Sequence, residues 1–252
     1  MKIVVIGGTG LIGSQVVSQL NMHGHDAVAA APNTGVNTLT GEGLAEVLEG
    51  ADVLVDVSNS PSFEDQAVYD FFETSTTNQL AACKAAGVGH HVALSVVGTQ
   101  LMADKGYFKA KARQEQLIVE SGMPYSIVHA TQFFEFLKSI AALATEGDTV
   151  RLPPVLFQPL AAEDVAKAVA RTAVGAPVNG IAEVAGPDRV RMDELIAQAL
   201  KAGNDPRTVV TDPDAPYFGV YQVDDTTLNP GDGAMLGDVH FQDWLERQLA
   251  TA

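Results

Sequence analysis

Three side chains in the middle of the sequence have the types and the spacing needed to pass a proton to a reacting oxygen. Tyr107 and Lys111 are four positions apart, so a helix would place both side chains on one face. An ammonium group beside a phenol lowers the pKa of the phenol, which would let a tyrosine exchange a proton near neutral pH. Ser95 ends an apolar run twelve positions before Tyr107, where its hydroxyl could hold a substrate oxygen. We predict that the three act together. The alternative, a helix-start aromatic with a solvated lysine, stays open.

The N-terminal residues predict the element that would bring a cofactor to these side chains. An apolar run at residues 3–6 is followed by Gly-Gly-Thr-Gly-Leu-Ile-Gly at 7–13, and then by apolar residues at helical spacing. A strand, a glycine turn and a helix in this order favour a dinucleotide site, because helix N–H groups bind phosphate and glycine lets the backbone approach it. The alternative is a glycine-rich turn that binds no ligand. We expect Gly10 and Gly13 to allow the pyrophosphate approach. The predicted contacts are Gly7, Thr9, Gly10, Leu11, Ile12 and Gly13.

The end of the second predicted strand, residues 26–31, should meet the adenosine ribose. Sites that prefer NAD usually place a carboxylate there, but this strand continues into Pro32, Asn33 and Thr34, and Asp26 lies at its opposite end. A 2′-phosphate would not be repelled, and Asn33 and Thr34 could donate hydrogen bonds to it. The sequence therefore favours NADP over NAD. No arginine is present to bind the phosphate, so two alternatives stay open: the cofactor is NAD, or this loop is a turn with no part in cofactor selection.

Further cofactor contacts are expected where later strands end. The strand predicted at 51–57 should lie beside the first strand, so the residues after it would pass the riboses. The residues after the strand predicted at 125–130 belong to the region that we expect on the substrate side of the cleft. These predicted contacts are Val57, Ser58, Asn59, Lys111, Thr131 and Phe133.

Strands and helices alternate along the first two thirds of the chain, which predicts an α/β Rossmann-type fold with a doubly wound parallel sheet. We expect a single domain over residues 1–252, with roughly 131–252 forming a smaller region on the substrate side of the cleft. The predicted strands are 3–6, 26–31, 51–57, 91–97, 125–130 and 181–184. The predicted helices are 43–49, 64–86 (with an interruption near 74–77 left open), 107–120, 133–144, 162–174 and 191–202.

The glycine turn is similar to the first turn of the short-chain dehydrogenase/reductase superfamily, and Ser95, Tyr107 and Lys111 match the arrangement that this superfamily uses for hydride transfer. Residues 121–128, Gln132-Phe133-Phe134 and residues 158–166 resemble its atypical, NmrA-like branch. The similarity covers most of residues 1–185. It departs at His129-Ala130, where the branch often has Arg-Pro.

The resemblance implies an NAD(P)H-dependent oxidoreductase that transfers hydride to a small carbonyl or quinone. Many members of the branch lack the tyrosine, so a non-catalytic redox sensor that binds the dinucleotide and a protein partner is the alternative. A sugar-nucleotide epimerase or isomerase is a third candidate. Retention of Tyr107 with Lys111 favours the enzyme.

Composition narrows the remaining choices. A net charge of −16 disfavours nucleic acid and anionic membranes as partners, which leaves a small-molecule substrate, with the oligomeric state open. One cysteine and no signal-like or membrane-length segment predict a cytoplasmic protein. His90 and His91 lack further ligands at metal-binding spacing, so no metal site is expected. We interpret His129 as a packed, hydrogen-bonded residue; the alternative is that it ends a strand facing the cleft and donates to a substrate oxygen. We interpret Glu163-Asp164 as a helix cap.

Overall fold

The computed structural model describes residues 1–250, and these residues divide into two compact units. The first unit comprises residues 1–129 and 165–182, and the second comprises 130–164 together with the described residues from 183 onward. The second unit therefore begins where the substrate-side region was expected, but residues 165–182 belong to the first.

A seven-stranded sheet with the strand order β12-β9-β5-β4-β3-β1-β2 confirms the predicted α/β class. Pairing is parallel between β1 and β2, β1 and β3, and β3 and β4. Ile6 at the end of β1 aligns with Ala30 of β2 and with Asp56 of β3, so three strands end at the same level. The strands are β1 (Lys2–Ile6), β2 (Asp26–Ala30), β3 (Val53–Asp56), β4 (His90–Val96), β5 (Tyr125–Ala130), β9 (Gly180–Ala185) and β12 (Met235–Leu236).

The strand order reverses at β1, because the chain first moves outward to β2 and then returns to the other side of β1 with β3, β4 and β5. In a doubly wound sheet, a ligand binds where the carboxyl ends of the strands meet such a reversal. The glycine turn that leaves β1 and the residues that leave β3 therefore lie at the expected binding edge.

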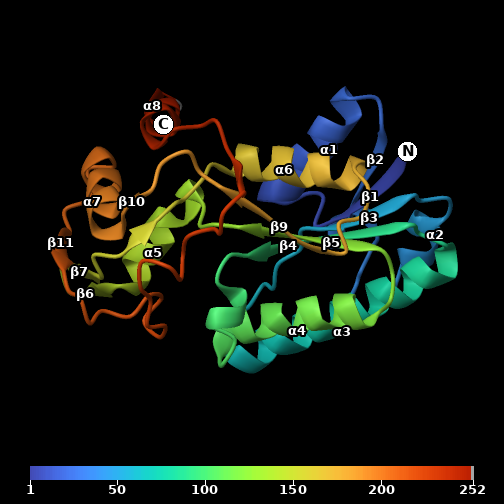
Figure 1. Ribbon diagram of the computed structural model, residues 1–252, viewed down its shortest axis with the longest axis horizontal. Coiled ribbons are helices and arrows are strands. Elements are labelled where there is room, and N and C mark those ends of the chain that lie inside the picture. Colours follow the sequence, from blue (N-terminus) through green and yellow to red (C-terminus); the bar gives the residue numbers. More distant parts are fainter. Residues whose placement is uncertain (251–252) are drawn as a thin grey trace. The chain divides into compact units, whose positions relative to one another are not determined.

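Helices cover both faces of the sheet in the first unit. Figure 1 shows α1 and α6 over one face and α3 with α4, lying side by side, over the other. Apolar residues on both faces of β1 and β3 are fully buried by this cover, as continuous apolar runs predict. The helices are α1 (Leu11–Met22), α2 (Leu44–Leu48), α3 (Asp65–Ala86), α4 (Gly106–Glu120) and α6 (Ala162–Val174).

Helix α3 runs without a break, so no interruption occurs near residues 74–77. Two of the polar side chains in this part of α3 bond within the helix, whereas the buried Thr76 Oγ1 has no hydrogen-bond partner among the described residues. Thr77 Oγ1 donates to the carbonyl oxygen of Glu73 at 2.7 Å, and Ser75 Oγ accepts from Gln79 Nε2 at 2.9 Å. Polar residues at this spacing mark a buried polar face of the helix rather than a turn.

The second unit is built from short elements. The helix predicted at 133–144 begins as a 3₁₀ turn at Phe134–Phe136 and continues as α5 (Leu137–Leu143). Phe134 packs against the rings of Phe241 and Trp244, which lie on α8 (Phe241–Ala250). The other elements are β6 (Thr145–Glu146), β7 (Thr149–Leu152), β8 (Leu156–Phe157), β10 (Val190–Arg191), α7 (Met192–Ala202) and β11 (Thr208–Thr211).

One buried group makes the fold sensitive to acid. His91 is fully buried in β4, and among the described residues neither of its ring nitrogens has a hydrogen-bond partner. Burial lowers the pKa of His91 to about 4, with Asp56 opposing the shift and His90 adding to it. The unfolded chain therefore binds a proton at His91 below the ordinary value of 6.5, whereas the folded chain does so only near pH 4.

We predict that this site costs the fold about 2–3 kcal/mol as the pH falls from 7.5 to about 4.5. His91→Leu removes the ionisable group at similar volume, so its free energy of unfolding should fall less over that interval. Urea unfolding at the two pH values measures the difference. His23→Gln, at an exposed position, is the control, and an equal acid loss in wild type and His91→Leu would contradict the prediction.

Candidate functional site

The glycine turn after β1 is shaped by close backbone contacts. Gly7 has a φ of +75°, and a Cβ there would lie 2.9 Å from the backbone of Ser58 after β3. A Cβ at Gly13 would lie 2.1 Å from the carbonyl oxygen of Gly7, so α1 can pack on the turn only with glycine at this position. Helix packing alone therefore requires glycine at position 13, whether or not the turn binds phosphate.

Gly10 has the open position in the turn. It is the N-cap of α1, no side chain caps the helix, and a Cβ at Gly10 would meet only the carbonyl oxygen of Gly7, at 3.3 Å. The first N–H groups of α1, beginning at Leu11 and Ile12, thus have no side-chain cap, and no side chain of Gly10 covers them. This arrangement fits the phosphates of a dinucleotide, which are bound by such N–H groups and by the helix dipole.

The loop after β2 lies against the glycine turn. Pro32–Thr34 form a 3₁₀ turn, and Thr9 Oγ1 donates to Asn33 Oδ1 at 3.2 Å. Thr34 Oγ1 accepts from the Ala31 N–H at 2.9 Å and lies within bonding distance of the Ala31 carbonyl oxygen, so its side chain is used to hold the turn. Of the predicted residues here, Asn33 keeps an exposed amide that can donate to a ligand.

The residues after β3 also reach this edge. The Val57 N–H donates to the carbonyl oxygen of Ile6 at 3.0 Å, which extends the pairing with β1 by one residue. Ser58 bends back, and both its N–H and its hydroxyl donate to Asp56 Oδ1, at 2.9 and 2.6 Å. Val57 and Ser58 therefore lie beside the glycine turn, in agreement with the topology inferred from the sequence, and Asn59 follows them.

Asp56 is a buried carboxylate that gathers side chains from both helices on its face of the sheet. Its Oδ2 accepts from Gln79 Nε2 of α3 at 3.1 Å and from Gln114 Nε2 of α4 at 2.9 Å. The amide oxygen of Gln114 in turn accepts from Lys111 Nζ. Gln114 thus bridges the carboxylate and the ammonium group, which do not touch.

Lys111 and Tyr107 lie on one helix face as predicted, but no hydrogen bond joins them among the described residues. Lys111 Nζ donates to the carbonyl oxygen of Leu94 at 2.8 Å and lies 4.4 Å from the centre of the Phe72 ring. Burial lowers the pKa of Lys111 to about 8, against the opposing charges of Asp56 and Glu115. Burial and the Asp56 charge raise the pKa of Tyr107 well above its usual value. The phenol therefore retains its proton.

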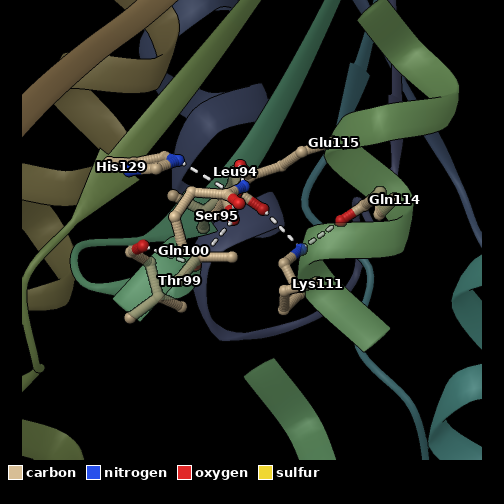
Figure 2. Close-up of polar contacts among 9 residues, drawn as sticks. Leu94, Ser95, Thr99, Gln100, Lys111, Gln114, Glu115 and His129 are labelled. Carbon is tan, nitrogen blue, oxygen red and sulfur yellow. Dashed lines mark hydrogen bonds and ion pairs between the residues drawn. The ribbon is translucent and has the colours of Figure 1, made fainter. Parts of the chain in front are cut away.

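Ser95 lies at the end of β4 in a second buried network, centred on Glu115 (Figure 2). Ser95 Oγ donates to Glu115 Oε1, and His129 Nε2 lies 2.9 Å from the same oxygen. Gln100 Nε2 donates to Glu115 Oε2 at 3.0 Å. Burial tends to raise the pKa of Glu115, but the hydrogen bonds from His129, Ser95 and Gln100 hold it below its usual value. Glu115 is thus an ionised carboxylate inside the protein.

The remaining predicted contacts, Thr131 and Phe133, belong to the second unit. Thr131 Oγ1 donates to the carbonyl oxygen of Gln158 at 2.5 Å, and Phe133 stacks on Phe136. This unit also holds a hollow of about 680 Å³, lined in part by Phe134, Leu195 and Phe241. None of the residues predicted from the sequence lines it, so it is not the site that the motifs indicate.

Sequence reasoning missed four residues that organise the site: Asp56, Gln79, Gln114 and Glu115. A signal was present for two of them. Gln114 and Glu115 follow Lys111 by three and four positions, so they share the inward face of α4. His129 is buried and hydrogen-bonded, as expected, but its partner is a carboxylate that the sequence analysis did not consider.

Other groups behave as structural residues. His90 Nε2 bonds with Ser126 Oγ at 2.9 Å, and no cluster of metal-binding side chains occurs among residues 1–250. Burial raises the pKa of the Cys83 thiol to about 12, which makes it unreactive. Over the same residues, no helix combines the length and apolar character needed to span a bilayer.

Residues 7–174 match a protein family described as NAD(P)H-binding. The chain is 27% identical over 230 residues to the chloroplastic divinyl chlorophyllide a 8-vinyl-reductase of Cucumis sativus, covering 75% of this chain and 53% of that protein. It is 23% identical over 151 residues to the photosystem II assembly factor Ycf39 of Synechocystis, covering 54% and 46%. The chain spans about half the length of these curated relatives.

Solved structures share the fold at low identity. MoeE5 in complex with UDP-glucose and NAD superposes with a TM-score of 0.75 at 17% identity, covering 99% of this chain and 98% of MoeE5. The UDP-glucose 4-epimerase of Thermus thermophilus, in complex with NAD, gives 0.73 at 17% identity with the same coverage. These similarities establish the Rossmann-like architecture.

The open position at Gly10 gives a direct test of the dinucleotide site. Gly10→Val should abolish NADP⁺ and NAD⁺ binding measured by calorimetry, because its side chain fills the space beside the first N–H groups of α1, while the fold stays intact. Gly180→Val is the matched control, since a Cβ there meets nothing closer than 3.8 Å and β9 accommodates valine. Unchanged affinity in Gly10→Val would eliminate this turn as the binding site.

Proposed function

The chain belongs to the NAD(P)H-binding family, in its atypical short-chain dehydrogenase/reductase-like, NmrA-like branch, and from this we propose that it is an NADPH-dependent oxidoreductase acting on a small carbonyl or quinone. One observation supports this reading above the others. Buried titratable groups at the ends of β3 and β4 lie on the same sheet edge as the uncapped glycine turn. A pure binding protein needs the turn but does not need these groups.

The chain's own backbone supplies the cofactor contacts. The N–H groups at the start of α1, from Leu11 and Ile12, would bind the pyrophosphate, and Ser58 would line the path of the riboses. The bound cofactor supplies the hydride. Asn33 would face the 2′-phosphate, and no carboxylate of the β2 loop opposes it. This is why NADP is favoured over NAD.

The three residues predicted from the sequence take separate parts in the proposed reaction. Lys111 would hold the nicotinamide ribose from its buried position above Leu94. Tyr107 would give its proton to the substrate oxygen. Its raised pKa keeps the phenol protonated until hydride transfer makes that oxygen strongly basic. Ser95 presents its hydroxyl at the end of β4.

Two other functions compete with this proposal. The assembly-factor relatives favour a dinucleotide-dependent sensor that binds a protein. The structural neighbours that hold UDP-glucose favour a sugar-nucleotide enzyme. A nucleotide diphosphate needs cationic groups. Arg151, Arg191 and Arg207 of the second unit are each paired with a carboxylate, whereas Arg189, which lines the hollow, donates to the amide oxygen of Gln158. One arginine at the hollow is little for a diphosphate, so we rank the sugar-nucleotide function behind the reductase.

Replacement of Tyr107 separates the reductase from the sensor. Tyr107→Phe keeps the ring that packs edge-on against Phe72, so the fold and cofactor affinity should be nearly unchanged. Loss of the hydroxyl should slow single-turnover NADPH oxidation by about 100- to 10,000-fold with the best of a panel of quinones and aldehydes. Lys111→Ala should weaken both cofactor binding and turnover.

A Tyr107→Phe rate within a few-fold of wild type would remove the tyrosine from the mechanism and leave a solvent proton as the donor. Binding of NADPH without oxidation by any member of the panel would instead favour the sensor.

The β2 loop allows the cofactor preference to be reversed. Asn33→Asp places a negative charge beside the expected 2′-phosphate, so NADP affinity should fall by about tenfold or more while NAD affinity holds or rises. Calorimetry with both nucleotides measures the ratio, and Asn37→Asp in the following loop is the control. If wild type already binds NAD tenfold better than NADP, the assignment of this loop is wrong.

A further inference from the structure

Gln114 is held in one orientation by two charged neighbours. Its Nε2 donates to the carboxylate of Asp56 at 2.9 Å, and its Oε1 accepts from the ammonium group of Lys111. A flipped amide would place an oxygen against the carboxylate and an NH₂ group against the ammonium group, so both contacts would become repulsive. All three residues are buried, with at most 2% of their surface exposed, so water does not compete for either bond. The amide oxygen is therefore a fixed acceptor for Lys111.

Lys111 uses two of its three ammonium protons inside the protein (Figure 2). One is donated to the carbonyl oxygen of Leu94 at 2.8 Å and one to Gln114 Oε1. Among the described residues, Nζ has no further oxygen acceptor. The Phe72 ring, whose centre lies 4.4 Å from Nζ, is a weaker partner for the third proton than an oxygen. That proton therefore remains for a hydroxyl of the nicotinamide ribose, the contact that the proposed function assigns to Lys111.

Gln79 provides an internal comparison for Gln114. Its Nε2 donates to the same Asp56 oxygen at 3.1 Å and to Ser75 Oγ at 2.9 Å, but no hydrogen bond joins it to Lys111 among the described residues. Both glutamines are fully buried. Asp56 thus receives two similar amide donors, one from α3 and one from α4, and only the donor on α4 continues to the ammonium group.

We propose that Gln114 is the positioning residue for the cofactor lysine: it holds the Lys111 ammonium group where the third proton can reach the ribose, and Asp56 fixes the amide that does so. This inference rests on the proposed function, because it concerns the contact between Lys111 and the cofactor. Gln114 itself does not touch the cofactor.

The charge of Lys111 depends on the groups around it. Burial lowers its pKa to about 8, and the charges of Asp56 and Glu115 oppose that shift. Tyr107, on the same helix face, has a pKa raised well above its usual value by burial and stays neutral. An oxygen that accepts from the ammonium group favours its charged form. NADPH affinity should therefore fall as the pH rises through about 8, and it should fall at lower pH when Gln114 Oε1 is removed.

The binding test replaces glutamines by methionine, which keeps an unbranched side chain of similar length without the amide. Calorimetry measures NADPH affinity from neutral to alkaline pH. Gln114→Met should bind NADPH about tenfold more weakly than wild type, through loss of a hydrogen bond to a charged group, and should lose affinity at lower pH. Gln79→Met removes a donor to the same Asp56 oxygen, so its smaller effect isolates the bond to Lys111. Gln116→Met, exposed on the same helix, is the control for the substitution itself.

A second measurement needs no cofactor. Lysine ¹³Cε chemical shifts report the charge of each ammonium group, and the Lys111 signal is assigned by its loss in Lys111→Met. The midpoint of the Lys111 titration should be lower in Gln114→Met than in wild type and should move less in Gln79→Met. Gln114→Glu is the opposite case, because a carboxylate in place of the amide favours the ammonium group and should raise the midpoint. If Gln114→Met does not fold, Gln114→Glu compared with Gln79→Met still decides.

The outcomes separate this inference from the proposed function. A Lys111 midpoint or an NADPH affinity that Gln79→Met changes as much as Gln114→Met does would overturn the role of Gln114 alone. NADPH affinity that Lys111→Met leaves unchanged would overturn the ribose contact on which this role depends. Failure of wild type to bind NADPH would overturn the proposed function together with the role.

Discussion

The carboxylate of Asp56 is the constraint on which this unit depends. A charge buried at the end of β3 is tolerated only if hydrogen bonds replace the water it has lost. Four bonds do so, from the backbone and hydroxyl of Ser58 and from the amides of Gln79 and Gln114. These donors come from the β3 loop, α3 and α4. Satisfying one carboxylate thereby sets the position of both helices relative to the edge where a cofactor would bind.

Helix α4 extends this constraint to the side chains proposed to take part in the reaction. Its inward face presents Lys111, Gln114 and Glu115 within little more than one turn. Gln114 ties the helix to Asp56, and Glu115 ties it to Ser95 and His129. The two carboxylates thus act on overlapping groups: the Asp56 charge acts on Tyr107 and Lys111, while that of Glu115 acts on Lys111 and is hydrogen-bonded to the residues at the ends of β4 and β5. The helix keeps the two sets in fixed register.

Local pattern was enough to predict the sheet, most helix boundaries and the glycine turn, because each depends on neighbours in sequence. The bounds of α6, Ala162–Val174, follow directly from its apolar spacing. The polar networks could not be predicted in this way, since Asp56 and Gln114 are far apart in the chain and meet only through packing. The polar run at residues 74–77 shows the same difficulty, because polar side chains on an unbroken helix suggest a helix break when only the sequence is considered. Tyr107 and Lys111 share a helix face, as their spacing implies. Spacing could not show that the Lys111 ammonium group donates a hydrogen bond to Gln114.

The strongly acidic chain raises the question of how it could hold an anionic dinucleotide. With a net charge of −16, the long-range field repels such a ligand. The glycine turn answers this locally, because the first N–H groups of α1 and the helix dipole act within a few ångströms of a phosphate, a range at which salt screens them little. The proposed site would need no arginine for the pyrophosphate. The 2′-phosphate of NADP has no such helix start at the β2 loop, where Asn33 is the exposed donor. In the proposed site, discrimination between the two nucleotides would therefore depend on the absence of a carboxylate more than on any attractive charge.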